Sequence, residues 1–306
     1  MIETRHPAPD AVYERLLDAS LERIWENVLD WEHLPWLHSQ AFSSVSMHSG
    51  DQDGWRGEVG LAGMAGAVAG IDVALDRANL RYLNRTVSGF GEGTGILTHL
   101  FPKGPRTTAI RVEFFFPWAP REAVAGIGEV YRSLYVGLWD QDEEMMRGRQ
   151  AVLDAAAASR EAGFAGLANA ATSHDAATPG GTRPRLPLGH ARQLAAKLPM
   201  DVVLAGRPIR LLMVEGRVLA FNTRCPHLGG PLREVVAGTC EADAGPPQVG
   251  VASVEAGAAS CVVACPWHGY RFDLLSGACL DGRRLRLVGS PVVEIDDATG
   301  EAALLL

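Results

Sequence analysis

Two short segments in the last third of the chain each pair a cysteine with a histidine. The first reads CPHLGG from Cys225, and the second reads CPWHGYRFD from Cys265. With His227 and His268 they offer two thiolates and two imidazoles. That donor set can hold a zinc ion or a [2Fe–2S] cluster in which one iron has nitrogen ligands. The surrounding prolines and glycines suit loops that enclose a cluster, whereas a zinc site has no need of them, so the pattern favours the cluster.

The two segments resemble the cluster-binding arms of Rieske proteins. On that resemblance, the thiolates of Cys225 and Cys265 bind one iron and the imidazoles of His227 and His268 bind the other. Neutral nitrogen ligands raise the reduction potential of such a cluster to between about −150 and +300 mV. The resemblance therefore implies a cluster that accepts and passes on single electrons.

Details of the arms point to one branch of these proteins. Respiratory-chain Rieske proteins carry a further cysteine in each arm, and the two form a disulfide. Here Gly230 and Trp267 hold those positions, and the form CPWHGYRFD resembles Rieske ferredoxins and the Rieske domains of ring-hydroxylating oxygenases. The 37 residues between His227 and Cys265 exceed the family's usual run. We expect a surface insertion at 237–258, where Gly, Ala, Glu and Pro accumulate.

Composition limits the class of protein. A chain of 306 residues is long enough for two domains, and 47% hydrophobic with 21% charged residues is ordinary for a globular protein. The net charge of −8 argues against nucleic acid or an anionic membrane as a partner. No apolar run is long enough to span a bilayer, and the N-terminal MIETRHPAPD lacks the pattern of a signal peptide.

Cysteine usage predicts the compartment. Two of the five cysteines are the proposed cluster ligands, which leaves Cys240, Cys261 and Cys279. An odd remainder in a chain without an export signal is better explained by reduced thiols than by disulfides. We therefore expect a cytoplasmic protein.

The periodicity of the sequence predicts an α+β protein of two domains. Residues 165–187 lose regular patterning and gather Pro, Gly, Thr and Ala, which predicts a linker between domains at 1–164 and 188–306. The second domain alternates in short strands, including one at Leu285–Leu287, and we expect an all-β Rieske sandwich with the cluster at the tip of two loops.

The first domain follows a different order. A strand is predicted at Ala11–Leu17, followed by a helix that Ser20 caps and that runs to about Trp31. Pro35 is expected to end regular helix, and a run of antiparallel strands follows. A long helix from about Arg121 to Ser159 closes the domain. This order resembles the helix-grip fold of the START-like (SRPBCC) family, in which the sheet curls around the last helix to enclose an apolar cavity.

A second group of possible metal ligands lies in this domain. The first helical segment reads ENVLDWEHLPWLH from Glu26, so Asp30 and His33 share a helix face, and the break at Pro35 lets His38 return to the same place. Two histidines need one carboxylate to complete the facial triad of a non-haem Fe(II) site.

The long helix offers that carboxylate. Asp142 falls in the middle of its apolar stripe, whereas Asp140 and Glu143 fall on the polar side. A buried carboxylate is costly unless a positive charge neutralises it, and iron would do so. The alternative is an Asp142 that pairs with Arg149 or is protonated.

The spacing E-x3-D-x2-H-x4-H resembles the mononuclear-iron signature of Rieske oxygenases. The surrounding residues, ENVLDWEHLPWLH, resemble those of the vanillate-demethylase and phthalate-oxygenase branch. That resemblance implies His33, His38 and Asp142 as iron ligands. It implies Asp30 as the acid that links His33 to a cluster histidine, His268, of a neighbouring subunit.

The leading interpretation is an oxygenase that uses O₂ to hydroxylate or dealkylate a hydrophobic, aromatic or polycyclic small molecule. A separate reductase or ferredoxin would supply electrons, and the chain would form a homo-oligomer, most simply a trimer. The domain order is inverted relative to the usual oxygenase, whose Rieske domain comes first. The alternative is a START-like ligand-binding domain fused to a Rieske ferredoxin-type module without catalytic iron.

Overall fold

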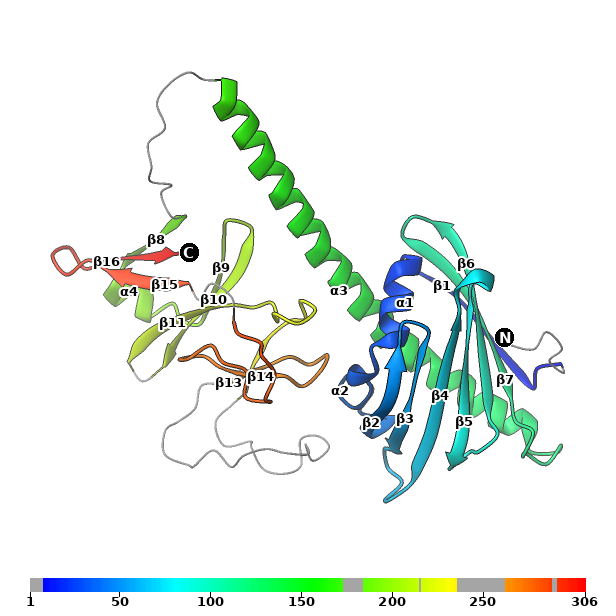
Figure 1. The fold of residues 1–306 in the computed structure, drawn as a ribbon. Helices are drawn as coiled ribbons and strands as arrows, with labels where there is room; N and C mark the ends of the chain where they lie inside the picture. Colours follow the sequence, from blue (N-terminus) through cyan, green and yellow to red (C-terminus); the bar gives the residue numbers. More distant parts are fainter. Residues whose placement is uncertain (1–7, 173–183, 215, 236–261, 288–290) are drawn as a thin grey trace. The chain divides into compact units, whose positions relative to one another are not determined.

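The computed structural model describes residues 8–172, 184–214, 216–235, 262–287 and 291–306. These residues divide into two compact units, one ending at Gly148 and one beginning at Arg149 (Figure 1). The predicted insertion at 237–258, with Cys240 and Cys261, lies outside the described residues.

The first unit is a seven-stranded antiparallel sheet in the order β1-β7-β6-β5-β4-β3-β2, with a long helix, α3, against one face (Figure 1). Its strands are β1 (Ala11–Leu17), β2 (Phe42–Asp51), β3 (Gly54–Leu61), β4 (Val68–Asp76), β5 (Arg81–Gly89), β6 (Gly95–Gly104) and β7 (Thr107–Phe115). The helical segments are α1 (Leu21–Leu29), η1 (Trp31–His33), α2 (Leu34–Leu37), η2 (Arg77–Asn79) and α3 (Val124–Thr172). This is the predicted helix-grip fold.

The core of this unit lies between α3 and the sheet. Phe114 and Val112 of β7 are completely buried, and Trp139 and Met146 of α3 are 3% exposed. Burying one such side chain contributes about 1.5–3 kcal/mol. The α3 stripe that packs on these strands also carries Asp142, so packing of the core fixes where that carboxylate lies.

The helical segment before the sheet differs from the expectation. Ser20 caps α1 as predicted and accepts a hydrogen bond from the Arg23 amide at 3.4 Å. However, α1 ends at Leu29, before Pro35, and Pro35 lies in the first turn of α2. Proline is tolerated there because the first amides of a helix have no intrahelical partner. The predicted helix end near Trp31 is two residues beyond the observed end at Leu29. The expectation that Pro35 stops helical structure is wrong, because α2 continues past it to Leu37.

The closing helix also differs in extent. It begins at Val124 and continues to Thr172, beyond the predicted end at Ser159, so residues 165–172 of the predicted linker are helical. Residues 173–183 lie outside the described part, and strand β8 begins at Arg185. The domain boundary at 164 stays a prediction.

The second unit is rich in β-structure. Its described residues form three sheets of three strands each, in the orders β11-β10-β9, β12-β13-β14 and β15-β16-β8. The strands are β8 (Arg185–His190), β9 (Met200–Leu204), β10 (Arg207–Val214), β11 (Arg217–Asn222), β12 (Arg233–Val235), β13 (Val262–Ala264), β14 (Arg271–Asp273), β15 (Val292–Ile295) and β16 (Glu301–Leu305).

The β-rich architecture agrees with the prediction, and a short helix, α4 (Ala191–Ala195), follows β8 with His190 as its N-cap. One expectation for this unit needs correction. The predicted strand at Leu285–Leu287 is wrong, since that segment contributes only the isolated bridge between Arg286 and Ala278. An isolated bridge joins only one pair of residues, so this segment is not a strand.

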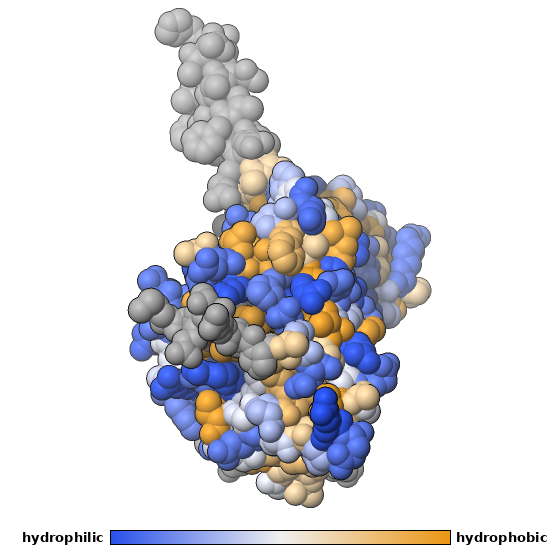
Figure 2. Space-filling model, turned by 90° about the vertical axis from the view of Figure 1, so that its right-hand side faces the viewer, coloured by the Kyte–Doolittle hydropathy of each residue, from blue (hydrophilic) through white to orange (hydrophobic). Residues whose placement is uncertain are grey.

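The outer surface is mixed in character. Hydrophilic side chains cover much of the face shown in Figure 2, with hydrophobic residues between them. None of the helices in the described ranges has an apolar stretch that could cross a bilayer.

Candidate metal centres

Two loops with the same backbone geometry carry the four donors of the second unit. In each, the glycine four residues after the cysteine donates its N–H to the cysteine carbonyl, at 2.9 Å from Gly229 to Cys225 and 2.8 Å from Gly269 to Cys265. Each cysteine N–H donates in turn to the carbonyl five residues on, at 2.8 and 2.9 Å. Both glycines have positive φ, +84° and +67°, which a side chain would strain. Two equivalent turns thus present two equivalent donor pairs.

The four donor side chains form one pair of sulfurs and one pair of imidazoles. Cys225 and Cys265 are buried and form a side-chain contact with each other. The rings of His227 and His268 lie edge to face, with 4.6 Å between their centroids and 82° between their planes. Among the described residues, only a group in the first unit brings three donors close enough to share one ion. A sulfur pair and a nitrogen pair fit the two irons of a [2Fe–2S] cluster better than one tetrahedral zinc.

The two thiols also influence each other's protonation. The hydrogen bond with Cys225 lowers the pKa of Cys265 to about 5, and the same contact raises the pKa of Cys225. One of the two sulfurs is thus a thiolate at neutral pH, which is the form that binds iron.

Gly230 and Trp267 lie side by side between the loops. A Cβ added to Gly230 would lie 2.7 Å from the Cys265 Sγ and 2.8 Å from the Trp267 ring. At the positions where a disulfide was considered, this chain packs an indole against a bare backbone. The packing leaves no room for a side chain at position 230.

Gly230→Ala should therefore displace Cys265. Overpacking of this kind costs about 1–3 kcal/mol, so we expect a lower melting temperature of the second unit and a reduced visible absorbance per chain. Gly104→Ala is the matched control, because nothing lies within 4 Å of the added Cβ and the backbone there is not left-handed. Full absorbance in Gly230→Ala would show that the loops relax without cost.

Residues 185–290 match the family model described as the Rieske [2Fe-2S] domain. The second unit contains a Rieske domain. All four donors lie within the matched residues, which cover about a third of the chain. A Rieske domain is a [2Fe–2S] electron-transfer module, and such domains occur in oxidoreductases.

Solved structures with a similar N-terminal part have low sequence identity. The Zhui aromatase/cyclase from Streptomyces sp. R1128 is 15% identical, and the alignment covers 45% of this chain and 93% of that one with a TM-score of 0.37. A START superfamily protein from Mycobacterium smegmatis is 19% identical over 44% of this chain and 97% of that one, with a TM-score of 0.34. No curated protein has a sequence that matches this chain.

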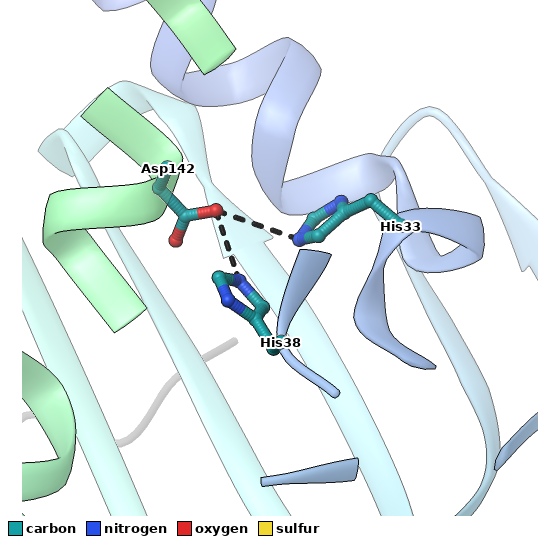
Figure 3. Close-up of side chains that lie close together, drawn as sticks. All are labelled: His33, His38 and Asp142. Atoms are coloured by element: carbon teal, nitrogen blue, oxygen red, sulfur yellow. Dashed lines mark hydrogen bonds and ion pairs between the residues drawn. The ribbon is translucent and has the colours of Figure 1, made fainter. Parts of the chain in front are cut away.

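The second candidate centre lies in the first unit, around α2. His33 precedes this single helical turn and His38 follows it, so their rings meet at 5.0 Å between centroids with planes 77° apart (Figure 3). Both side chains are buried, at 4% and 2% exposure. The separation between His33 and His38 therefore corresponds to one short helix with a histidine as the cap at each end.

Asp142 of α3 completes the group. Its Oδ1 lies 3.0 Å from the His38 Nε2 and 3.5 Å from the His33 Nε2 (Figure 3). The same oxygen accepts a hydrogen bond of 2.9 Å from the Asn27 side chain. The hydrogen bond and ion pairs of Asp142 thus go to α1 and to the residues flanking α2, rather than to Arg149 as in the alternative interpretation.

The group alters the acidity of its members. Burial would raise the pKa of Asp142, but the hydrogen bond with His38 and the charges of both histidines lower it below its ordinary value. Burial would likewise lower the pKa of His38, but the hydrogen bond and charge of Asp142 raise it. Without a metal, both shifts favour a protonated His38 beside a charged Asp142.

Gln141 decides which nitrogen of His38 carries a proton. The Gln141 amide oxygen lies 2.7 Å from the His38 Nδ1, so Nδ1 donates to it. In the neutral ring the Nε2 lone pair then faces the Asp142 Oδ1, and two acceptors oppose each other at 3.0 Å. Either a second proton on His38 or a cation between the two atoms resolves this. Ligating histidines commonly donate their other N–H in this way.

Asp30 and Glu26 take different positions. Asp30 caps the end of α1, and its Oδ2 lies 3.7 Å from the His33 Nδ1, too far for a hydrogen bond. That nitrogen is buried without a hydrogen-bond partner. Glu26 forms an ion pair with Arg23 at 2.8 Å. Of the two carboxylates, only Asp30 is directed at a candidate ligand.

The group forms part of the wall of a cavity of about 140 Å³ between α3, the sheet and the α1–α2 segment. Large apolar side chains dominate the wall: Trp31, Phe42, Trp55, Ile71, Val73, Leu138 and Trp139. The Trp55 indole donates to the Val28 carbonyl at 3.0 Å and so attaches the end of α1 to the sheet.

Sequence reasoning missed two residues of this site, Asn27 and Gln141. Each is adjacent to a position that it did discuss, Glu26 and Asp142. The available signal was burial: Asn27 is 7% exposed in a short helix of otherwise charged and apolar residues. A buried amide requires hydrogen-bond partners.

Proposed function

We propose that this chain is a Rieske-type non-haem iron oxygenase that hydroxylates or dealkylates a hydrophobic small molecule. One observation carries the proposal. Two imidazole nitrogens and one buried carboxylate converge on the wall of an apolar cavity, in a chain that also contains a Rieske domain. This donor set, two histidines and one carboxylate, is that of non-haem Fe(II) oxygenases.

The residues of the chain would divide the work as follows. His33, His38 and Asp142 would hold the iron, while Gln141 fixes the tautomer of His38 and Asn27 orients Asp142. The cavity walls would place the substrate beside them and exclude water. Cys225, His227, Cys265 and His268 would hold the cluster. The iron would supply activation of O₂, and the cluster would supply electrons received from a separate reductase or ferredoxin.

A second candidate function has an observation in its favour. The His38–Asp142 ion pair satisfies both groups without a metal. The first unit could then bind a hydrophobic ligand while the Rieske domain transfers electrons independently.

Iron content separates the two. The oxygenase should contain three irons per chain after anaerobic reconstitution, two from the cluster and one from the mononuclear site. Two irons per chain, with no change on His33→Ala, would support the ligand-binding alternative. Elemental analysis against protein concentration makes the measurement.

Asp30 provides a test of how the two centres communicate. It would act as a positioning residue for His33 and as the link to His268 of a neighbouring subunit in a trimer. Asp30→Asn should keep both metal centres and substrate binding, but slow reoxidation of the reduced cluster when substrate and O₂ are added. Stopped-flow absorbance follows that reoxidation.

Two results would contradict this role for Asp30. One is unchanged reoxidation in Asp30→Asn at full iron content. The other is a monomer with normal turnover, because the path would then not cross between subunits. Glu26→Gln is the matched control, since Glu26 pairs with Arg23 instead of with a candidate ligand.

A further inference from the structure

The cavity beside the candidate iron site has no side chain suited to receiving an anionic substrate. Asp30 and Asp142 belong to its wall, and neither lysine nor arginine is found among the described residues that line it. These two carboxylates already offset the charge of a protonated His38 or of a bound divalent iron, so the carboxylate of an aromatic acid would meet no net positive charge. Burying an unpaired charge costs several kcal/mol, so the cavity disfavours anions.

A cationic substrate is disfavoured for a different reason. With a divalent iron at His33, His38 and Asp142, the two wall carboxylates balance the charge of the metal. A substrate cation would then gain no net attraction and would lose its hydration. This step rests on the proposed function, because it assumes that the iron is bound.

Neutral hydrogen-bonding groups also face the cavity. Tyr135 and Asn84 line it, and neither side chain makes a hydrogen bond with the part of the chain that the structure describes. Burial above all, and then the charges of nearby groups including Asp142, raise the pKa of Tyr135 well above its ordinary value, so its phenol stays neutral. A neutral phenol and an amide can bind a carbonyl or hydroxyl oxygen.

The size of the cavity limits the number of rings. A volume of about 140 Å³ is close to the engineered cavity of about 150 Å³ that holds one benzene molecule in another protein. Trp31, Trp55 and Trp139 are among the side chains that bound this volume. The polycyclic alternative for the substrate is therefore less favoured than a single ring.

We propose that the substrate is an uncharged single-ring molecule with a carbonyl or hydroxyl group that Tyr135 and Asn84 bind. This differs from what the vanillate-demethylase and phthalate-oxygenase resemblance suggests, since the substrates named in that resemblance are aromatic carboxylates. The difference lies in the wall of the cavity, where the described residues include two asparagines and two tyrosines but no arginine.

Three probes of the same shape test the charge. Benzamide is neutral, benzoate is its anionic counterpart and benzamidine is its cationic counterpart. Binding to the full chain is followed by tryptophan fluorescence, because Trp31, Trp55 and Trp139 line the cavity. We expect benzamide to bind at least about 10-fold more tightly than either ion, and more tightly than the two-ring 2-naphthamide.

Substitutions in and near the cavity wall test where benzamide binds. Tyr135→Phe should weaken benzamide about 3- to 10-fold, the ordinary effect of one lost hydrogen bond. Tyr131→Phe is the matched control one helical turn away, because the Tyr131 ring packs on Phe114 and Phe116 outside the lining of this cavity. Asn84→Lys should add the missing cation and improve benzoate binding, and a melting curve checks that it folds.

The outcomes separate this inference from the proposed function. Benzoate or benzamidine bound as tightly as benzamide by a chain with three irons would overturn the neutral-substrate inference alone. Two irons per chain with benzamide still preferred would overturn the oxygenase and leave the ligand class supported. Preference for benzamidine in a chain with two irons would overturn both.

Discussion

Cys225→Ser and His268→Ala should each abolish the electron paramagnetic resonance signal of the reduced cluster. A hydroxyl does not replace a thiolate toward iron, and alanine offers no ligand. The N-terminal unit should stay folded, since its core of α3 and sheet side chains lies apart from these loops in the chain. The measurements are the resonance spectrum after reduction by dithionite and the circular dichroism of the same sample.

Cys279→Ser is the matched control for the cluster ligands. Cys279 is a free, partly buried cysteine in the same unit and is not one of the four donors. Its substitution should leave the signal in place. Wild-type protein that stays colourless after anaerobic reconstitution with iron and sulfide would contradict the assignment of the ligands.

His33→Ala, His38→Ala and Asp142→Ala should each remove about one iron per chain and abolish O₂-dependent turnover, with the cluster signal intact. Loss of outer partners alone commonly costs about 10–100-fold in metal affinity, so loss of a ligand should cost about 100-fold or more. Asp142→Ala also leaves His38 without its ion pair, and we expect a lower melting temperature for that variant even without metal.

Asp140→Ala is the control for the carboxylate. Asp140 lies two residues from Asp142 on α3, but its side chain is 58% exposed and pairs with Arg15 at 2.5 Å. Exposed ion pairs contribute about 0–1 kcal/mol, so iron content and turnover should stay close to wild type. Equal losses from the Asp140 and Asp142 substitutions would show that the assignment of the ligand is wrong.

Helical periodicity correctly separated the two aspartates. The apolar stripe of α3 packs on the sheet, so the residue on that stripe is buried at 8% exposure and its neighbour on the polar side is not. Periodicity also placed the end of the first helix within two residues, near Trp31 against the observed Leu29. The separate rule that proline ends a helix failed at Pro35, because proline is tolerated in a first turn and a new helical turn begins there.

Hydrophobic alternation predicts exposed edge strands less well than buried strands. Strand β2 (Phe42–Asp51) is mostly exposed and pairs on one side only, with β3, so it lacks a continuous buried face. In contrast, β1 at the other edge of the sheet has the predicted bounds, Ala11–Leu17, and both of its end residues are buried. Burial creates the alternation that sequence analysis detects, and an exposed edge strand needs none.

The sequence by itself determined the donors. The spacing within the two arms, and that from Asp30 through His33 to His38, are local features that short loops and one helical turn preserve. The tertiary structure decided which donors meet. Only packing of α3 against the sheet brings Asp142, more than a hundred residues away, to both histidines. Only the fold adds Asn27, Gln141 and a cavity whose described lining has no lysine or arginine. Contacts between distant segments depend on the packing of the whole core, and no local pattern of residues encodes that packing.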